Sequence, residues 1–85
     1  MARKPLTDEQ RAEGARISAH LRETRRSLGR EQVEIARGAG VSVDELRAIE
    51  GRRVATPSFV VIARLARELE LGLDPFAREV LRSDD

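Results

Sequence analysis

Residues 32–49, which read QVEIARGAGVSVDELRAI, decide the fold of this chain. Gly40 divides the stretch, and a glycine there can take the positive φ that a tight reversal needs. Ser42 and Glu45 follow it with the spacing of a capping box, which marks the start of a helix. Apolar residues recur at helical spacing on both sides of the glycine, with Val33, Ile35, Ala36 and Ala39 before it and Leu46 and Ile49 after it. The stretch therefore predicts two short helices joined by a tight turn.

Two short helices joined by a turn of about four residues make a helix-turn-helix, here over about residues 31–50. Ala36 is small at the place where the two helices must cross closely. Any helical hairpin could also supply a small residue and a glycine, so the spacing alone does not distinguish a helix-turn-helix from another helical hairpin. Neither helix could bury its apolar side by itself, and further helices are expected around the pair.

The segment before this motif predicts one helix. Thr7 and Gln10 form a second capping box, an apolar stripe follows, and Gly29 lies where a left-handed C-terminal cap is usual. Gly14 is expected to interrupt this helix. We therefore assign residues 1–16 to an N-terminal arm or extension of the first helix.

The segment after the motif predicts two more helices. Thr56-Pro57-Ser58 marks the start of one, and Asp74-Pro75 marks the start of the other, beyond a break at Gly72. The five helices predict a compact all-α domain over residues 17–76. Residues 77–85 are expected to form the end of the fifth helix and an acidic tail. A chain of 85 residues has room for one such domain.

The composition argues against several classes of site. The chain has no cysteine and one histidine, His20, so a zinc site, a disulfide or a histidine-dependent nucleophile would lack partners. We therefore expect no metal, no cofactor and no enzymatic activity, and no separate domain for a small-molecule ligand. No apolar run approaches the ~20 residues of a membrane span, and the first ten residues lack the apolar core of a signal peptide. These features predict a cytoplasmic protein that is not bound to a membrane.

Charge is unevenly distributed along the chain. Residues 1–30 hold eight Lys/Arg and four acids, whereas residues 31–50 hold two arginines and five acids. Arg52 and Arg53 follow, with no acid before Pro57. The basic segments are compatible with contacts to nucleic-acid phosphate, although such segments are also common on solvated helix faces.

From residue 17 to residue 76 the sequence resembles the Cro and phage-repressor class of regulators, also called the xenobiotic-response-element family. The matching positions, which follow one another without insertions, are Gly29, Gln32, Ala36, Gly40-Val41-Ser42, Ile49-Glu50, Arg52-Arg53, Pro57-Ser58, Leu65-Ala66-Arg67, Leu69 and Leu73-Asp74. The resemblance implies a five-helix domain like that of λ repressor. It also implies a small bacterial transcriptional regulator, by expectation a repressor, that binds double-stranded DNA at the nucleoid.

The resemblance implies roles for individual residues. Gln32 matches a side chain that anchors to backbone phosphate, and Arg52 and Arg53 match a basic loop that grips phosphate after the recognition helix. Arg25 and Glu50 match an ion pair that ties the first helix to the end of the third. The third helix would enter the major groove with Ser42, Val43, Asp44, Arg47 and Ala48.

The third helix departs from the usual composition of a recognition helix. Asp44 and Glu45 place negative charge near phosphate, and Arg47 is its one strong reader of bases. Asp44 could accept a hydrogen bond from a cytosine amino group, whereas Val43 and Ala48 could contact thymine methyl groups. An acidic third helix also fits a protein partner, so an adaptor, anti-repressor or antitoxin module is the alternative function.

Regulators that read one half-site with one helix usually bind as two-fold dimers. The C-terminal region carries more apolar residues than a small end helix needs, and we expect them to contribute to a homodimer. These residues are Leu71, Leu73, Phe76, Val80 and Leu81. The alternative is that they close the core of the single chain.

Overall fold

The first helix starts at the capping box that the sequence predicts. The computed structural model describes residues 5–82, and in it the Gln10 backbone N–H donates to the Thr7 hydroxyl at 3.0 Å. The Thr7 backbone N–H donates back to Gln10 Oε1 at 2.9 Å. These two bonds satisfy donors that a helix start leaves open, and α1 (Asp8–Ser27) begins directly after them. Leu28 caps the C-terminal end of the helix, and Gly29 then takes the left-handed conformation with φ 67°, as predicted.

Gly14 does not interrupt α1, so that expectation is wrong. The helix is continuous from Asp8 to Ser27, and Gly14 is buried within it. A Cβ atom at this position would lie 2.6 Å from the backbone oxygen of Ala55, which belongs to the connection between the third and fourth helices. The glycine therefore allows a close approach between two segments that are 41 residues apart, and it is not a break in the helix.

Four short helices follow α1 within residues 5–82: α2 (Gln32–Ala39), α3 (Val43–Glu50), α4 (Phe59–Glu68) and α5 (Leu73–Val80). Two starts differ slightly from the predicted ones. The Ser58 hydroxyl accepts a bond from the Val61 backbone N–H at 3.2 Å, so Ser58 caps α4 and Pro57 lies outside the helix. Gly72 caps α5, which places Pro75 within its first turn, where a missing N–H costs no helical bond.

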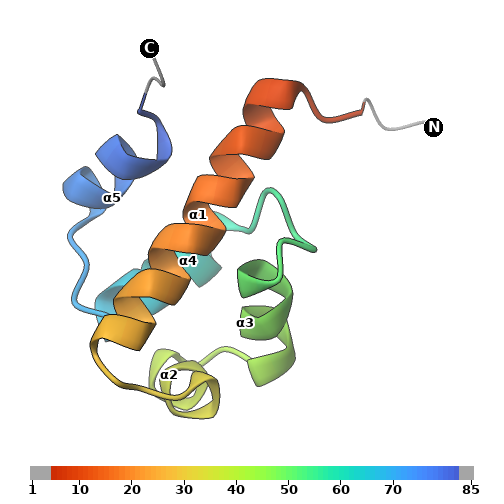
Figure 1. Ribbon diagram of the computed structural model, residues 1–85. Coiled ribbons are helices and arrows are strands. Elements are labelled where there is room, and N and C mark those ends of the chain that lie inside the picture. The colour runs from red at the N-terminus through yellow and green to blue at the C-terminus, as the bar shows by residue number, and fades with distance from the viewer. Residues whose placement is uncertain (1–4, 83–85) are drawn as a thin grey trace.

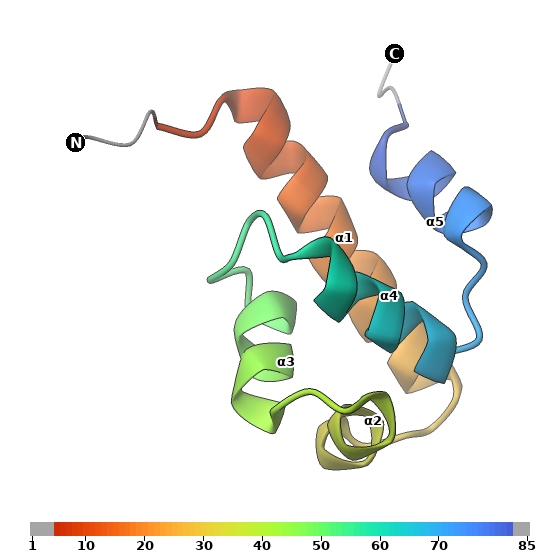
Figure 2. The ribbon, with the colours of Figure 1, turned by 180° about the vertical axis from the view of Figure 1, so that it is seen from behind.

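Helix α1 crosses the middle of the molecule, with α3 on one side of it and α5 on the other (Figure 1). Seen from behind, α4 is the nearest helix, and α2 lies at the lower end of the bundle (Figure 2). The buried core draws on all five helices and consists of Leu21, Ile35, Ala36, Ala39, Leu46, Ile49, Ile62, Leu65, Leu69, Phe76 and Val80. Residues 5–82 contain helices and no strand, which confirms the predicted all-α fold. No helix in this range is long and apolar enough to cross a membrane.

Candidate nucleic-acid interface

The turn between α2 and α3 has the geometry that the sequence predicts. Gly40 takes φ 76° and ends α2, and the Val41 backbone N–H then donates to the Ala36 carbonyl at 3.0 Å. The Ser42 hydroxyl accepts a bond from the Glu45 backbone N–H at 3.0 Å and so caps α3. This is the Ser42 half of the predicted capping box, and the Glu45 side chain is exposed to solvent. The turn thus holds the start of α3 at the surface while Leu46 is buried.

A buried ion pair joins α1 to the end of α3. Arg25 Nε donates to Glu50 Oε2 and Arg25 Nη2 donates to Glu50 Oε1, each at 2.8 Å. The Glu50 side chain is only 4 % exposed, and the Ser18 hydroxyl donates to its backbone carbonyl at 2.8 Å. Burial disfavours the charged carboxylate, but hydrogen bonds from Arg25 and Gln32 outweigh burial and lower the pKa of Glu50 below its ordinary value. The geometry is the one expected of a structural pair.

Gln32, the first residue of α2, extends this pair toward the surface. Its Nε2 atom donates to Glu50 Oε1 at 3.0 Å, and its Oε1 atom accepts a bond from Arg47 Nε at 3.4 Å. An amide nitrogen carries two hydrogens, so one donor of Gln32 remains after the bond to Glu50. Gln32 therefore links the buried pair to an exposed arginine of α3.

The outward side of α3 carries most of the residues predicted to face DNA. Asp44 is 94 % exposed, and Arg47 is half-exposed with its Nη1 atom 3.9 Å from Asp44 Oδ1. Ala48 is partly exposed, and Ser42 is exposed while it caps the helix. Val43 is half-buried and packs against the core, so part of its side chain is turned away from solvent.

Arg52 and Arg53 follow α3 in an exposed turn. The Arg53 backbone N–H donates to the Ala48 carbonyl at 2.8 Å, and this bond ties the turn to the last part of α3. Arg52 takes a left-handed backbone conformation with φ 64°, which non-glycine residues adopt at a cost of about 1–2 kcal/mol. The bond from the Arg53 N–H therefore holds the backbone of this turn against the end of α3, with both arginine residues exposed.

A shallow basic hollow of about 450 Å³ lies where α1, α2 and α3 meet. We call it the basic hollow, and its lining residues are Arg22, Arg25, Arg26, Glu31, Gln32, Arg47, Glu50 and Gly51. Glu50 neutralises Arg25, whereas Arg26 is exposed. The Nε atom of Arg22 is buried and has no hydrogen-bond partner among the described atoms. The hollow thus offers positive charge beside α3, together with the remaining donor of Gln32.

Arg22 and Arg26, which the sequence alone suggests are ordinary surface charge, both line the basic hollow. The signal that could have found them is the spacing around Arg22, which lies three residues before Arg25 and four before Arg26, because residues three or four apart on a helix share a face. A face that carries the partner of Glu50 must point toward α3. Across the described residues, no group of three or more His, Cys, Asp or Glu is placed to hold a metal ion.

The residues predicted to contribute to a dimer do not form one surface. Phe76 and Val80 are buried in the core of the single chain, and Leu71 packs partly against that core. Leu73 and Leu81 remain exposed. The apolar surface of α5 is therefore smaller than the sequence pattern predicts, because two of its residues are used to attach the helix to the rest of the fold.

Comparison with protein families matches residues 16–79 to the helix-turn-helix domain. The matched range covers most of α1 and nearly all of α5, and it contains the whole surface described above. No curated protein matches the chain. Since the family match spans well over half of the sequence, the chain belongs to the family of helix-turn-helix domains.

Proposed function

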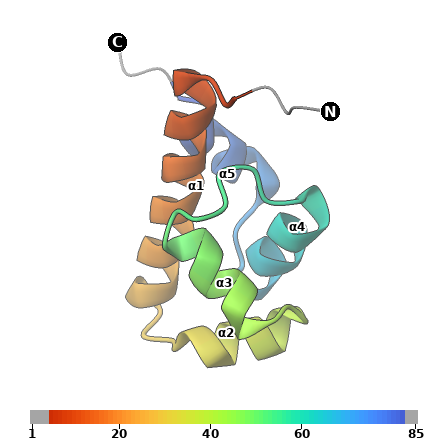
Figure 3. The same cartoon turned by 90° about the vertical axis from the view of Figure 1, so that its right-hand side faces the viewer.

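We propose that the protein binds double-stranded DNA in a sequence-specific manner, with α3 in the major groove, and acts as a small transcriptional regulator. One observation carries the proposal: the exposed side of α3 lies directly beside the basic hollow, and Arg47 belongs to both. A helix that reads bases needs neighbouring groups that hold phosphate, because phosphate contacts fix its register in the groove. Figure 3 shows α3 on the near side of the molecule, with α1 and α4 on either side of it.

The side chains of α3 suit a limited set of base contacts. Arg47 can donate two hydrogen bonds to guanine, and Asp44 can accept one from a cytosine amino group. Ala48 and the exposed part of Val43 can contact thymine methyl groups. Because Arg47 is the strongest of these readers, it carries most of the proposed base specificity.

Two groups of residues can supply phosphate contacts. Gln32, with its remaining donor, lines the basic hollow together with Arg22 and the exposed Arg26. Arg52 and Arg53 lie in the exposed turn that follows α3. These cations also offset the negative charge of Asp44 and Glu45, which would otherwise repel the DNA backbone.

A domain of this kind regulates by occupying its site. Bound DNA is denied to other proteins, so the proposed action is repression at the bacterial nucleoid, within the cytoplasm. A single recognition helix buries little surface, and two copies of the chain on two half-sites would raise both affinity and specificity.

The proposal is tested by selection from a randomised duplex pool. Protein is equilibrated with the labelled pool at two salt concentrations, binding is followed by fluorescence anisotropy, and the retained duplexes are sequenced. We expect a conserved sequence and an affinity that falls steeply with salt, because each neutralised phosphate contributes a slope of about 0.9 in the log–log plot.

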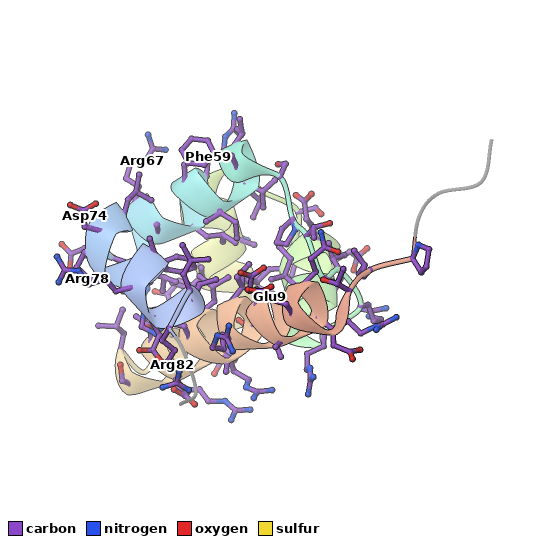
Figure 4. All side chains as sticks on the ribbon, turned by 90° about the horizontal axis from the view of Figure 1, so that it is seen from above. Glu9, Phe59, Arg67, Asp74, Arg78 and Arg82 are labelled. Carbon is purple, nitrogen blue, oxygen red and sulfur yellow. The ribbon has the colours of Figure 1, made fainter. Side chains whose placement is uncertain are left out.

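A matched control is Arg78→Ala, since Arg78 is an exposed arginine of α5, far from α3 (Figure 4). This variant is expected to bind as the unmodified protein does, whereas loss of binding would place the DNA surface elsewhere. Absence of retained duplexes even at low salt would refute DNA binding. The acidic third helix would then be the surface to test for a protein partner.

A further inference from the structure

The N-terminal part of α1 precedes the region that matches the helix-turn-helix family. The match begins at residue 16, whereas α1 begins at Asp8, so about two turns of this helix lie outside it. A stretch of helix this short is not stable alone in water and depends on what it packs against. We call residues 8–15 the α1 extension. Its contacts with the rest of the fold therefore decide where its side chains lie.

The α1 extension packs against the connection between α3 and α4. Gly14 is buried at this contact, where a Cβ atom would lie 2.6 Å from the backbone oxygen of Ala55. Arg52 belongs to the same connection, which runs alongside α1 in Figures 1 and 3. The lack of a side chain at Gly14 thus brings the α1 extension next to the turn that carries Arg52.

A small pocket of about 130 Å³ lies between these two segments. We call it the Arg11–Arg52 pocket, and its lining residues are Arg11, Gly14, Ala15, Arg52, Val54 and Ala55. Each segment contributes one arginine, and none of these lining residues is acidic. A cavity needs about 10–15 Å³ to hold one water molecule, so this pocket has room for a larger group such as phosphate. Its size and its charge both suit an anion.

Three acids in the α1 extension could offset the charge of Arg11. Glu9 and Glu13 lie two positions from Arg11, so they project from the other side of the helix. Asp8 lies three positions before it and shares its face, with Asp8 Oδ1 3.1 Å from Arg11 Nη1. Both side chains of this pair are exposed, and exposed pairs are weak. Arg11 can therefore exchange Asp8 for a phosphate group at little cost.

We infer that the Arg11–Arg52 pocket binds a phosphate group of the DNA backbone, in addition to the contacts made by α3 and the basic hollow. The inference rests on the proposed DNA binding. Arginine presents a planar fork of N–H donors that matches the oxygens of phosphate, and two arginines from different segments can hold one phosphate between them. Because Arg52 lies in the turn that follows α3, the pocket is next to the proposed recognition surface.

The position of Arg11 on α1 separates this contact from the basic hollow. Arg22, which lines the hollow, follows Arg11 by eleven residues, close to three helical turns. Both arginines therefore lie on one face of α1, about 16 Å apart along its axis. The α1 extension thus lengthens the proposed DNA surface with an arginine that the helix-turn-helix match does not contain.

A phosphate of DNA is favoured over a free anion because the arginine that the extension supplies is open to solvent. Arg11 is 58 % exposed, so water screens much of its attraction for an ion in solution. A phosphate of a duplex that α3 already holds is present at a high effective concentration, and a weak contact then still contributes to binding.

The test uses the duplex recovered by the selection and a series of the same duplex in which one phosphate at a time is replaced by an uncharged methylphosphonate. We expect Arg11→Ala to lower the salt slope by about 0.9, the share of one phosphate, without changing the preferred base sequence. In the series, one methylphosphonate position per bound copy should weaken binding of the unmodified protein more than binding of Arg11→Ala. Arg78→Ala is again the matched control and should respond to every position as the unmodified protein does.

Asp8→Asn tests the same contact with the opposite sign. Removal of the Asp8 carboxylate frees Arg11, so we expect tighter binding, and the gain should disappear when Arg11→Ala is also present. Glu9→Gln removes the same charge from the other side of the helix and should give a smaller gain. Urea unfolding checks that each variant keeps the stability of the unmodified protein, as expected for exposed side chains.

Three results would overturn the inference while DNA binding stays intact: an unchanged salt slope in Arg11→Ala, no methylphosphonate position whose effect depends on Arg11, or a gain in Asp8→Asn that persists without Arg11. With an unchanged salt slope, stabilisation of the unmodified protein but not of Arg11→Ala by inorganic phosphate at matched ionic strength would assign the pocket to a free anion. A pool from which no duplex is retained would refute the proposed function and this inference together.

Discussion

Replacing Glu50 with alanine removes the acceptor of three side-chain hydrogen bonds, two from Arg25 at 2.8 Å and one from Gln32 at 3.0 Å. Hydrogen bonds to charged groups contribute about 1.5–3 kcal/mol each, so the two bonds from Arg25 alone set a scale of about 3–6 kcal/mol. The Arg25 side chain is 11 % exposed, and water can satisfy only part of it. We expect Glu50→Ala to lower the free energy of unfolding by about 3–5 kcal/mol, the usual cost of breaking a buried pair.

Urea unfolding at pH 7, followed by circular dichroism, measures this loss. A chain of 85 residues has a total stability of about 4–13 kcal/mol, so the variant is expected to be marginally folded. The control is Arg11→Ala, which removes a solvent-exposed pair with Asp8 at 3.1 Å and is expected to leave stability unchanged. The double variant Arg25→Met with Glu50→Leu should be more stable than Glu50→Ala, because no charge is left buried without a partner.

The pH dependence gives the same pair a second test. The pKa of Glu50 is lower in the folded protein than in the unfolded chain, so its stabilisation is complete above the unfolded value of about 4.3. It is lost as the pH falls through the lower folded pKa. The stability difference between the unmodified protein and Glu50→Ala should therefore shrink below about pH 4. The coupling would be refuted if Glu50→Ala were as stable as the unmodified protein at pH 7. It would also be refuted if the stability lost in the double variant equalled the sum of the losses in Arg25→Met alone and Glu50→Leu alone.

Four further substitutions have definite expected outcomes. Arg47→Ala should lower affinity by about 1–3 kcal/mol and relax specificity at one or two base positions, as measured by anisotropy on single-base variants of the selected duplex; uniform weakening would show a phosphate role instead. Arg22→Ala and Arg53→Ala should each weaken binding to all duplexes alike and reduce the salt slope by about 0.9, and an unchanged slope would exclude that residue from phosphate contact. Gly14→Ala should lower the free energy of unfolding by about 1–3 kcal/mol despite the better helix propensity of alanine, because its Cβ would collide with the Ala55 backbone. A stabilised variant would show that the connection between α3 and α4 is free to move.

The helix starts could be predicted because they are encoded locally. The Thr7 and Ser42 caps depend on residues three positions away, and the structure has both. The role of Gly14 cannot be predicted in this way, because it is not encoded locally. Its role depends on contact with Ala55, and no pattern within a helical window contains that information.

The candidate site shows the same difference between features encoded locally and features that depend on distant contacts. Arg25 and Glu50 could be paired in advance only because the sequence resembles a known family, since 25 residues separate them. Phe76 and Val80 were expected to be candidates for a dimer surface, but they are buried where α5 packs against the rest of the chain. Apolar spacing identifies the inward side of a helix without saying whether the same chain or a second copy covers it. Phe59 shows the opposite case, because it has the spacing of a core position in α4 and yet is 70 % exposed.

The Arg25–Glu50 pair also bears on how an acidic helix can present a base-reading arginine. The Glu50 carboxylate accepts a hydrogen bond from Gln32 Nε2, and Gln32 Oε1 in turn accepts one from Arg47 Nε. The Nη1 atom of Arg47 lies 3.9 Å from Asp44 Oδ1. An arginine held from two sides loses less side-chain entropy when it binds than a free one does. In the proposed complex, Asp44 therefore has a use beyond contact with cytosine, because it orients Arg47 toward the groove. The acidity of α3 then contributes to the proposed specificity, while the basic hollow and the turn with Arg52 and Arg53 supply the attraction to phosphate.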